Sequence, residues 1–528
     1  MRIPVNNLYE VGMQADPSPN ELPLNGLTLV SNMRVQDGGI ESIAGYAPPF
    51  TAPTVNPSFL QPVAGADTYA WLYGGKSTVD QLFAYMSGAH TDVTRLAGSY
   101  AGSDWRTTIL NGVVVLTNNL DVPQMWSPVL GRAQDLTAWP TGLSAMTIRS
   151  YKNFLLAFGL ADLADHPYTL RWSHPADPGT VPASWDVSDP NTDAGEVSLA
   201  DTGGAIIDSM PLRNANVIYK EDALYLMNYI GGTSVFDFKK VSSEVGVIAP
   251  NLVAQFDYKG SQHIVLTASD LILFDGQNVV SLLSKRMRRW LFSLISEASI
   301  GKSRIVVNQL RSEVWVAFCT GATAYCDKAL IWNWLDNTFT VRDLPNIRAI
   351  TSGVVLDPSL TGVAQWDTVV ETWATANSVW GSRTFRQGAL QILGSPGAVP
   401  EWHLFDYGTT ANGSEITSRA ERTGLTVYGQ NWRGELMQDV EVQKLLTEVW
   451  PRIEASAGLT VNVYVGAQMR RSDPVTWAGP YPFNPATDKK VNCLVSGKLL
   501  SVAFEAPATT GWKLFGYDLE IRPVGRGL

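Results

Sequence analysis

Short apolar runs, each entered from a polar turn, recur along the middle of the chain at a regular distance. The second residues of five such turns stand at positions 112, 153, 222, 270 and 313, so the gaps are 41, 69, 48 and 43 residues. Three gaps match the roughly 40–50 residues of a four-stranded propeller blade, and the longest fits a blade with an insertion of roughly 25 residues. The runs are Val113–Leu116, Phe154–Phe158, Ala223–Met227, Leu271–Phe274 and Val314–Phe318. The spacing predicts a β-propeller-like region; unrelated hairpins in β-sandwiches are the alternative.

Helical periodicity is scarce. One helix is predicted over Ser284–Ser299, where apolar residues share a face. Four cations gather at its start: Lys285, Arg286, Arg288 and Arg289. Because cations at a helix N-terminus oppose the macrodipole, the cluster indicates an external partner. A second short helix is predicted near Val440–Glu448.

The last part of the chain alternates apolar and polar residues and predicts an antiparallel β module. Its strands are expected at Leu459–Val465, Val491–Val495, Leu499–Phe504 and Trp512–Ile521. The predicted organisation is an N-terminal arm over residues 1–50, a propeller-like region over 51–440 and a C-terminal module over 441–528. Insertions are expected near 160–210 and 357–426, the second being another blade, a loop-rich insertion or a docking surface. The predicted fold class is mainly β, a β-propeller-like repeat region with a C-terminal antiparallel β module.

Composition narrows the class of protein. Charged residues make up 17% of the 528 residues, below the roughly 25% of ordinary proteins, while hydrophobic residues reach an ordinary 45%. These values exclude coiled-coil, collagen-like and intrinsically disordered chains. The 18 Trp and 18 Tyr residues, together with the low charge, favour a surface that partners cover.

The net charge of −10 bears on nucleic-acid binding. A sequence-specific DNA reader carries a basic surplus that neutralises phosphates, so the acidic balance disfavours that class. It is compatible with an acidic wall along which DNA slides. The start of the chain lacks the apolar core of a signal peptide, and the longest apolar run, Phe154–Ala161, is far shorter than the roughly 18 residues of a membrane helix. The sequence predicts synthesis in a reducing cytoplasm and no membrane insertion.

Two tripeptides imitate a phosphate-binding loop, and both lack its first glycine. Ala70 stands five residues before Gly75-Lys76-Ser77, and Ser296 stands five residues before Gly301-Lys302-Ser303. Without that glycine the backbone amides cannot wrap a phosphate, so neither tripeptide predicts nucleotide binding.

Patterns for metal or redox chemistry are also missing. The stretch Asp189–Asp193 has the spacing of a calcium loop but lacks its turn glycine and its bidentate glutamate, which favours a turn held by Asx side chains. The five histidines are far apart, and the three cysteines form no CxxC pair. Cys319 and Cys326 flank a short hairpin and are interpreted as buried small groups rather than a redox pair. No cofactor, metal or catalytic residue is assigned.

Four stretches of the chain resemble one family of viral proteins. They are Ser243–Pro250 followed by Leu266–Gly276; Asn32–Tyr46, with its two spaced glycines; Ala183–Asp186 with Asp193–Val197; and Gly511–Glu520 with Gly525–Gly527. Together they resemble the tail hub proteins of short-tailed bacteriophages (podoviruses), also called tail nozzle or packaged-DNA stabilisation proteins.

The resemblance implies a structural virion protein and no enzymatic activity. Such proteins form a ring, typically a hexamer, below the portal and the adaptor (the head-to-tail connector). The ring continues the DNA channel, retains the packaged genome and docks a tail needle, plug or fibres. The implied partners are further copies of the chain, the portal-adaptor proteins, these distal parts and, non-specifically, the double-stranded DNA that passes during genome ejection. The implied location is the virion tail, after synthesis in the host bacterial cytoplasm.

The resemblance also implies a reason for the charges. Six copies at −10 carry −60, which makes an acidic lumen that repels DNA. The cluster Lys285, Arg286, Arg288 and Arg289 then grips DNA or an acidic adaptor surface; a solvated helix end answered by neighbouring carboxylates is the alternative. A second class of function stays open, a β-propeller hydrolase or binding protein acting on host surface polysaccharide. Propellers host glycosidases, and 49 carboxylates offer many pairs for such chemistry.

Overall fold

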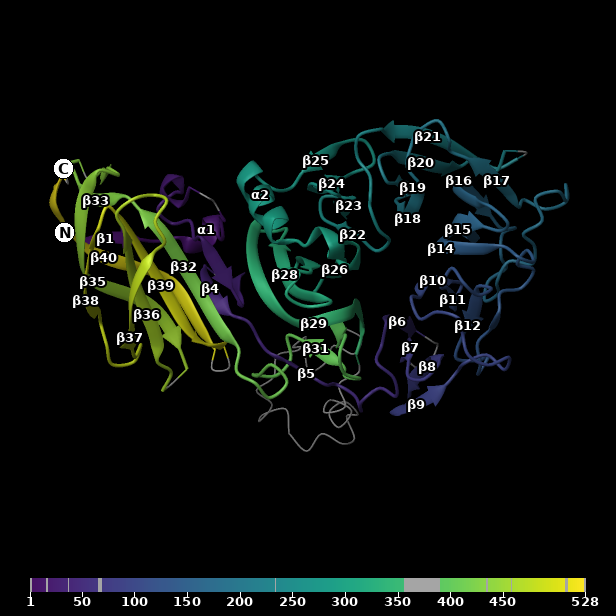
Figure 1. Cartoon of the computed structure of the whole chain (residues 1–528), viewed down its shortest axis with the longest axis horizontal. Helices are drawn as coiled ribbons and strands as arrows, with labels where there is room; N and C mark the ends of the chain where they lie inside the picture. The colour runs from purple at the N-terminus through teal and green to yellow at the C-terminus, as the bar shows by residue number, and fades with distance from the viewer. Residues whose placement is uncertain are drawn as a thin grey trace, which may run out of the picture.

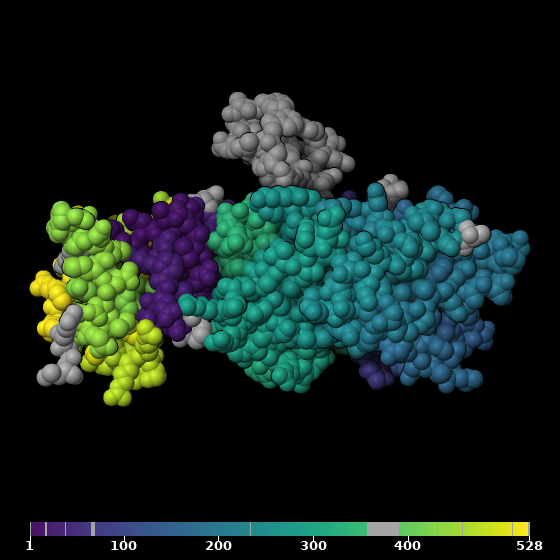
Figure 2. Space-filling model, turned by 90° about the horizontal axis from the view of Figure 1, so that it is seen from above, coloured from purple at the N-terminus to yellow at the C-terminus, as the bar shows by residue number. Residues whose placement is uncertain are grey.

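The computed structural model describes residues 2–526 apart from residues 16–17, 37, 65–68, 233, 356–389, 434, 457 and 509–510. Two β units lie side by side in Figure 1, a ring of sheets on the right and a two-sheet sandwich on the left. From above they form one elongated slab, and the purple N-terminal segment lies beside the green and yellow C-terminal strands (Figure 2). The chain is mainly β, with 53% strand and 5% helix, as the sequence predicts.

Five antiparallel sheets of four strands follow one another along the chain. The first contains β6 (Phe59–Ala64), β7 (Tyr69–Lys76), β8 (Asp80–Met86) and β9 (Ala89–Asp92). The second contains β10 (Arg106–Leu110), β11 (Val113–Thr117), β12 (Gln124–Trp126) and β13 (Gln134–Asp135). The third contains β14 (Ser144–Tyr151), β15 (Phe154–Ala161), β16 (Asp165–Trp172) and β17 (Gly195–Ser198). The fourth contains β18 (Ile206–Leu212), β19 (Ala215–Lys220), β20 (Leu224–Tyr229) and β21 (Phe236–Ser242), and the fifth contains β22 (Val253–Asp257), β23 (Ser261–Leu266), β24 (Leu271–Phe274) and β25 (Val279–Ser281).

Two further sheets share one long strand, β29 (Thr338–Val354). Its first half completes a sheet with β26 (Arg304–Asn308), β27 (Glu313–Phe318) and β28 (Cys326–Asn333). Its second half begins another with β30 (Leu390–Pro396), β31 (His403–Phe405) and, from the N-terminal segment, β5 (Tyr46–Ala47). The ring closes because the second half of β29 lies beside β6, where the indole N–H of Trp71 donates to the carbonyl of Val354 at 3.2 Å. The described residues thus form seven blade-like sheets.

The blades explain the spacing found in the sequence and confirm the prediction of a propeller-like region. The second strands of the first six sheets begin at residues 69, 113, 154, 215, 261 and 313. The third blade is the longest because residues 173–194 connect β16 to β17 without regular structure. The apolar runs of the sequence are second strands in some blades, such as β11, and third strands in others, such as β20. Second strands are largely buried on both faces because blades on either side cover them; all six residues of β27 are buried.

The sandwich consists of two sheets around a shared core. One sheet contains β1 (Arg2–Val5), β3 (Met33–Gln36), β4 (Gly39–Ser42), β35 (Val442–Ala455), β38 (Val491–Gly497) and β40 (Trp512–Arg526). The other contains β2 (Leu29–Ser31), β32 (Thr417–Leu425), β36 (Val461–Gln468), β37 (Thr476–Phe483) and β39 (Leu499–Pro507), and β33 (Val427–Gln430) forms a hairpin with β34 (Leu436–Gln438). Alternate residues of β36, such as Val461 and Val463, are buried in the core. The four strands predicted in this region are present.

Three expectations about organisation differ from the structure. Residues 1–50 do not form a separate arm, because β1 and β4 pair with β40 and β5 completes the last blade. The sandwich begins before residue 441, since β32 pairs with β39. Of the expected insertion at 357–426, residues 357–389 lie outside the described residues, and the remainder contributes β30 and β31 to the last blade and β32 to the sandwich. The helix predicted near Val440–Glu448 is wrong: β35 lies there, and β38 and β40 pair with its two edges.

Helix is confined to short segments in the described part of the chain. They are α1 (Leu8–Val11), the 3-10 turn η1 (Pro19–Glu21), α2 (Lys285–Leu294) and the 3-10 turn η2 (Glu297–Lys302). The prediction of a helix over 284–299 is confirmed up to Leu294, after which Ile295 takes an extended conformation.

A buried ion network joins the sandwich to the propeller. Arg34 of β3 is paired with Glu313 of β27 and lies 2.8 Å from a carboxylate oxygen of Asp406. Arg342 of β29 lies 2.7 Å from the other oxygen of Asp406. Burial raises the pKa of Asp406, but the two guanidiniums outweigh burial and hold that pKa well below its ordinary value. The network therefore fixes the two units against each other.

Candidate functional site

The basic cluster of the sequence lies on α2, at the junction between the propeller and the sandwich (Figure 1). Ser284 caps the helix by accepting a hydrogen bond from the amide of Met287 at 3.2 Å. Met287 and Leu291 are buried, and the backbone nitrogen of Ala15 lies 3.1 Å from the sulfur of Met287. The cations of the cluster therefore lie on the outward side of α2; three are exposed and Arg288 is half-buried.

Two of the four cations have carboxylate partners within the chain. Arg286 lies 2.5 Å from Glu21 of η1, and Arg288 lies 2.8 Å from Asp270 in the fifth blade. For these two arginines the structure agrees with the alternative interpretation, in which neighbouring carboxylates neutralise the cations at the start of the helix. Both pairs are partly exposed, so each stabilises the fold by about 1 kcal/mol at most.

Lys285 and Arg289 have no ion pair among the residues that the structure describes. Together with Arg288, Phe292 and Glu297 they line a surface hollow of about 410 Å³. The hollow combines positive charge with aromatic and aliphatic walls, which suits an acidic side chain or a phosphate group. The four predicted residues thus lie together on one surface, but only two of them are available to a partner.

Charged side chains also meet at the axis of the propeller, where sequence analysis assigned no site. Arg149 of β14 makes a bidentate pair with Asp208 of β18, at 2.6 and 2.9 Å. Arg106 of β10 interacts electrostatically with this pair and with Arg304 of β26. Burial lowers the pKa of Arg106, Asp104 opposes the lowering, and Arg304 adds to it. No local pattern signals this group, because its members come from four separate blades.

Large apolar side chains are exposed at two opposite ends of the slab. The sandwich end carries Trp432, Leu494 and Val524, and the blade end carries Val129, Leu163 and Ile230. Trp432 is 85% exposed and Val129 is 95% exposed. The first group belongs to β38, β40 and the β33–β34 turn, and the second to the connections after β12, β15 and β20. These elements lie at the left and at the right of Figure 1. Other exposed apolar residues, such as Leu96 and Leu335, belong to neither group, and scattered ones are ordinary; the two groups are candidate contact surfaces.

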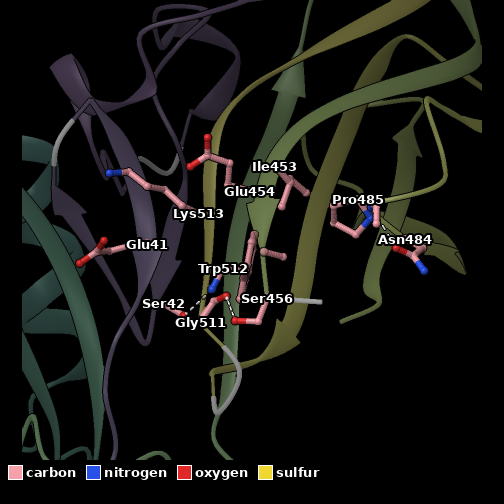
Figure 3. A pocket seen from close by; sticks show the side chains of 12 residues that line it. Glu41, Ser42, Ile453, Glu454, Ser456, Asn484, Pro485, Gly511, Trp512 and Lys513 are labelled. Atoms are coloured by element: carbon pink, nitrogen blue, oxygen red, sulfur yellow. Dashed lines mark hydrogen bonds between the residues drawn. The ribbon is translucent and has the colours of Figure 1, made fainter. Parts of the chain in front are cut away.

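A hollow of about 740 Å³ opens on the sandwich between β4, β40, β35 and the loop at 484–486. Figure 3 shows its walls, including Trp512, whose backbone N–H donates to the hydroxyl of Ser42 at 3.1 Å. Lys513 stands between Glu41 and Glu454 on the neighbouring strands, so the charges alternate across the sheet. Sequence analysis missed this hollow because its walls come from segments more than 400 residues apart.

The structure also places the motifs that the sequence analysis discounted. Gly75 lies within β7 and Gly301 within η2, so neither begins a loop between a strand and a helix. The amide of Asn191 donates to the carboxylate of Asp189 at 2.9 Å, as expected for an Asx turn. Across the described ranges, no three His, Cys, Asp or Glu residues are grouped so that they could hold a metal. No described helix has the length and apolar character needed to cross a membrane.

Comparisons with known proteins place the chain in no established family. No family model matches it, and no curated protein matches it. Among solved structures, the crystal structure of the WD40 β-propeller domain of Doa1 aligns with a TM-score of 0.36 and 8% identity, covering 69% of this chain and 96% of that chain. The assignment of a propeller-like fold rests on the blade sheets of this chain described above.

Proposed function

We propose that this chain is a structural protein of a short-tailed bacteriophage tail, a hub or nozzle subunit that forms a closed ring with further copies. The ring lies below the portal and adaptor, continues the DNA channel, retains the packaged genome and docks distal tail parts. The resemblance of the four sequence stretches supports the virion assignment. The observation that carries the ring is the presence of exposed apolar residues at two opposite ends of the slab.

Two different contact surfaces favour head-to-tail association. Such contacts repeat from copy to copy and either close into a ring or continue as a filament, and a DNA channel requires closure. Burying one exposed Leu or similar side chain contributes about 1.5–3 kcal/mol, so three residues on each surface supply a substantial part of an interface. The sandwich end also presents β38, which carries Leu494 and pairs only with β35 in the described sheets.

In this ring the outward side of α2 faces DNA or an acidic adaptor surface. Lys285 and Arg289 make this contact, because Arg286 and Arg288 already have carboxylate partners. Charge reversal of Lys285 and Arg289 to Glu is expected to impair virion assembly or genome retention while the subunit still folds. Unchanged infectivity of the double variant argues against a role for this surface.

The ring is tested by blocking one end at a time. A blade-end variant carries Leu163→Asp with Ile230→Asp, and a sandwich-end variant carries Trp432→Asp with Leu494→Asp. Neither variant alone is expected to form rings with the adaptor. In an equal mixture, the intact sandwich end of one variant binds the intact blade end of the other. Both remaining ends are blocked, so assembly is expected to stop at dimers. Val280→Asp is the matched control, since Val280 is exposed on β25 between the two ends. Mass photometry and electron microscopy measure the products.

The virion itself gives the second measurement. Cryo-electron microscopy of particles is expected to show six copies directly below the adaptor. Rings that form normally from both blocked variants contradict the proposed contact surfaces. Three copies at a distal spike, or absence from virions, contradict the proposed function and favour a propeller hydrolase or binding protein acting on host polysaccharide.

A further inference from the structure

Two buried cysteines contact each other at the turn end of the β27–β28 hairpin. The sulfur atoms of Cys319 and Cys326 lie 3.7 Å apart. Cys319 directly follows β27 and Cys326 begins β28, so the residues between them form the turn. The sequence pattern favoured buried small groups at the two ends of a hairpin rather than a redox pair; burial is confirmed, and the structure in addition brings the two sulfurs into contact.

The surroundings make Cys319 the more acidic of the two thiols. The hydrogen bond with Cys326 lowers the pKa of the Cys319 thiol; burial and the charge of Asp327 oppose the lowering, and the cations of Lys302 and Arg304 add to it. The same hydrogen bond, together with burial, raises the pKa of Cys326. Cys319 is therefore suited to act as the nucleophile and Cys326 as the resolving thiol, which is the division of roles in oxidisable cysteine pairs.

Access to the pair comes from the turn. Gly321, Ala322 and Ala324 are exposed, although both sulfurs are buried. The end of a hairpin opens locally at a much smaller free-energy cost than the whole domain, so a small oxidant reaches the sulfurs without unfolding the blade.

We propose that Cys319 and Cys326 are an oxidative modification site, which a peroxide converts into an intramolecular disulfide. The thiolate of Cys319 attacks one peroxide oxygen and the O–O bond breaks, which leaves a sulfenic acid on Cys319 and releases water after protonation. The sulfur of Cys326 then attacks the sulfur of Cys319, and the S–S bond forms as the S–O bond breaks. The hydroxyl leaves as water with the proton of Cys326. Two thiols and one hydrogen peroxide thus become one disulfide and two water molecules.

The disulfide would hold the segment that supports α2. The N–H of Ser296 donates to the carbonyl of Cys319 at 2.9 Å, and the ammonium group of Lys302 donates to the carbonyl of Ala324 at 2.9 Å. Opening of the hairpin therefore loosens η2 and the C-terminal end of α2. Cross-linking the hairpin restrains this motion and leaves the charges of the basic cluster unchanged. The inference is independent of the proposed function, since it concerns only the chemistry of the folded chain.

The test uses the full-length protein, treated with hydrogen peroxide and then alkylated in denaturant. Trypsin releases both cysteines on one peptide, Ser312–Lys328, because no Lys or Arg lies between them. That peptide is expected to lose the mass of two hydrogen atoms and to regain it after treatment with a thiol reductant. Cys493 is the internal control: burial raises its pKa to about 12, so it is expected to remain a thiol and to be alkylated.

Variants separate the two steps. Cys326→Ser is expected to retain a sulfenic acid on Cys319 that dimedone labels, whereas Cys493→Ser is the matched control that still forms the disulfide. Three alkylated thiols after peroxide, a sulfinic acid without the disulfide, or a cross-link between two chains on a non-reducing gel would each overturn the proposal. The peptide mass from the unmodified sequence decides the question even where a variant fails to fold.

Discussion

Replacing Asp406 with Asn removes one negative charge from a buried ion network that is otherwise balanced. Arg34 and Arg342 carry the positive charges of this network, and Glu313 and Asp406 carry the negative charges. The substitution keeps the size of the side chain but leaves one guanidinium without a counter-charge. Arg342 is affected most, because its side chain is 1% exposed and Asp406 is its ion-pair partner at 2.7 Å.

The expected cost follows from the contacts that remain. Removing one partner of a buried ion pair costs about 3–5 kcal/mol of unfolding free energy. The amide oxygen of Asn still accepts one hydrogen bond, and Arg342 keeps its bonds to the carbonyls of Ala44 and Gly45. We therefore expect the lower end of the range, a loss of about 3 kcal/mol.

Urea unfolding at neutral pH, followed by tryptophan fluorescence and circular dichroism, measures this loss. The matched control is Glu441→Gln, which breaks the pair with Lys498 where the Glu441 side chain is 66% exposed; this change is expected to cost less than about 1 kcal/mol. The two units can unfold separately, so the transitions seen by the two probes are compared. An Asp406→Asn variant with an unchanged urea midpoint and slope would refute the reasoning.

Lowering the pH tests the contribution of the Asp406 charge to stability in a second way. The pKa of Asp406 is held below its unfolded value, which is about 3.9. Its contribution to stability is therefore fully present above about pH 4–5 and is lost as the pH falls further, through the lowered pKa of the folded state. The difference between the original chain and Asp406→Asn should narrow below about pH 4. A difference that stays constant down to acid unfolding would show that charge is not the cause.

Three further changes test other parts of the fold. Gly45→Ala is expected to lower the melting temperature by several degrees, because its Cβ would lie 2.1 Å from the carbonyl oxygen of Thr410, whereas Gly301→Ala, with its nearest neighbour at 3.6 Å, should have little effect. Burial lowers the pKa of His263 to about 4, below the unfolded value of about 6.5, so its contribution to stability is present above about pH 6.5 and falls towards pH 4. His263→Gln should flatten that part of a plot of urea midpoint against pH. Lys444→Met should cost about 1–3 kcal/mol by urea unfolding, because the buried ammonium group donates to three backbone carbonyls that would lose their partner.

The propeller-like fold is visible in the sequence because each blade repeats its own strands and turns locally. The number of blades is not visible, because the last sheet takes β5 from the N-terminal segment and shares β29 with its neighbour. The segment at 440–448 was predicted as a helix, but from Val442 on it is part of the strand β35. Its Lys, Leu and Glu residues are good helix formers, but β38 and β40 pair with both of its edges, and this tertiary pairing overrides local propensity.

The candidate site also combines features that the local sequence predicts with features that only the folded chain creates. Ser284 and the apolar face of α2 are local features, and they correctly predict a helix that presents its cations outward. Glu21 and Asp270 neutralise two of these cations, and both come from distant segments that only the folded chain brings together. The charges at the propeller axis come from separate blades, so spacing in the sequence does not reveal them. The hairpin flanked by Cys319 and Cys326 was visible in the sequence, but the contact between the two sulfurs was not predicted.

The pairing of β1 with β40 delays the formation of the sandwich sheet while the chain is being synthesised. Arg2 pairs with Glu520, 518 positions later. At roughly 5–20 residues per second, the first strand waits roughly half a minute to two minutes on the ribosome before its partner emerges. The early blades can fold as they appear, whereas the sandwich sheet stays open until β40 has been synthesised. A chain interrupted before β40 keeps these strand edges unpaired, which lets proteases and chaperones distinguish incomplete products from finished subunits.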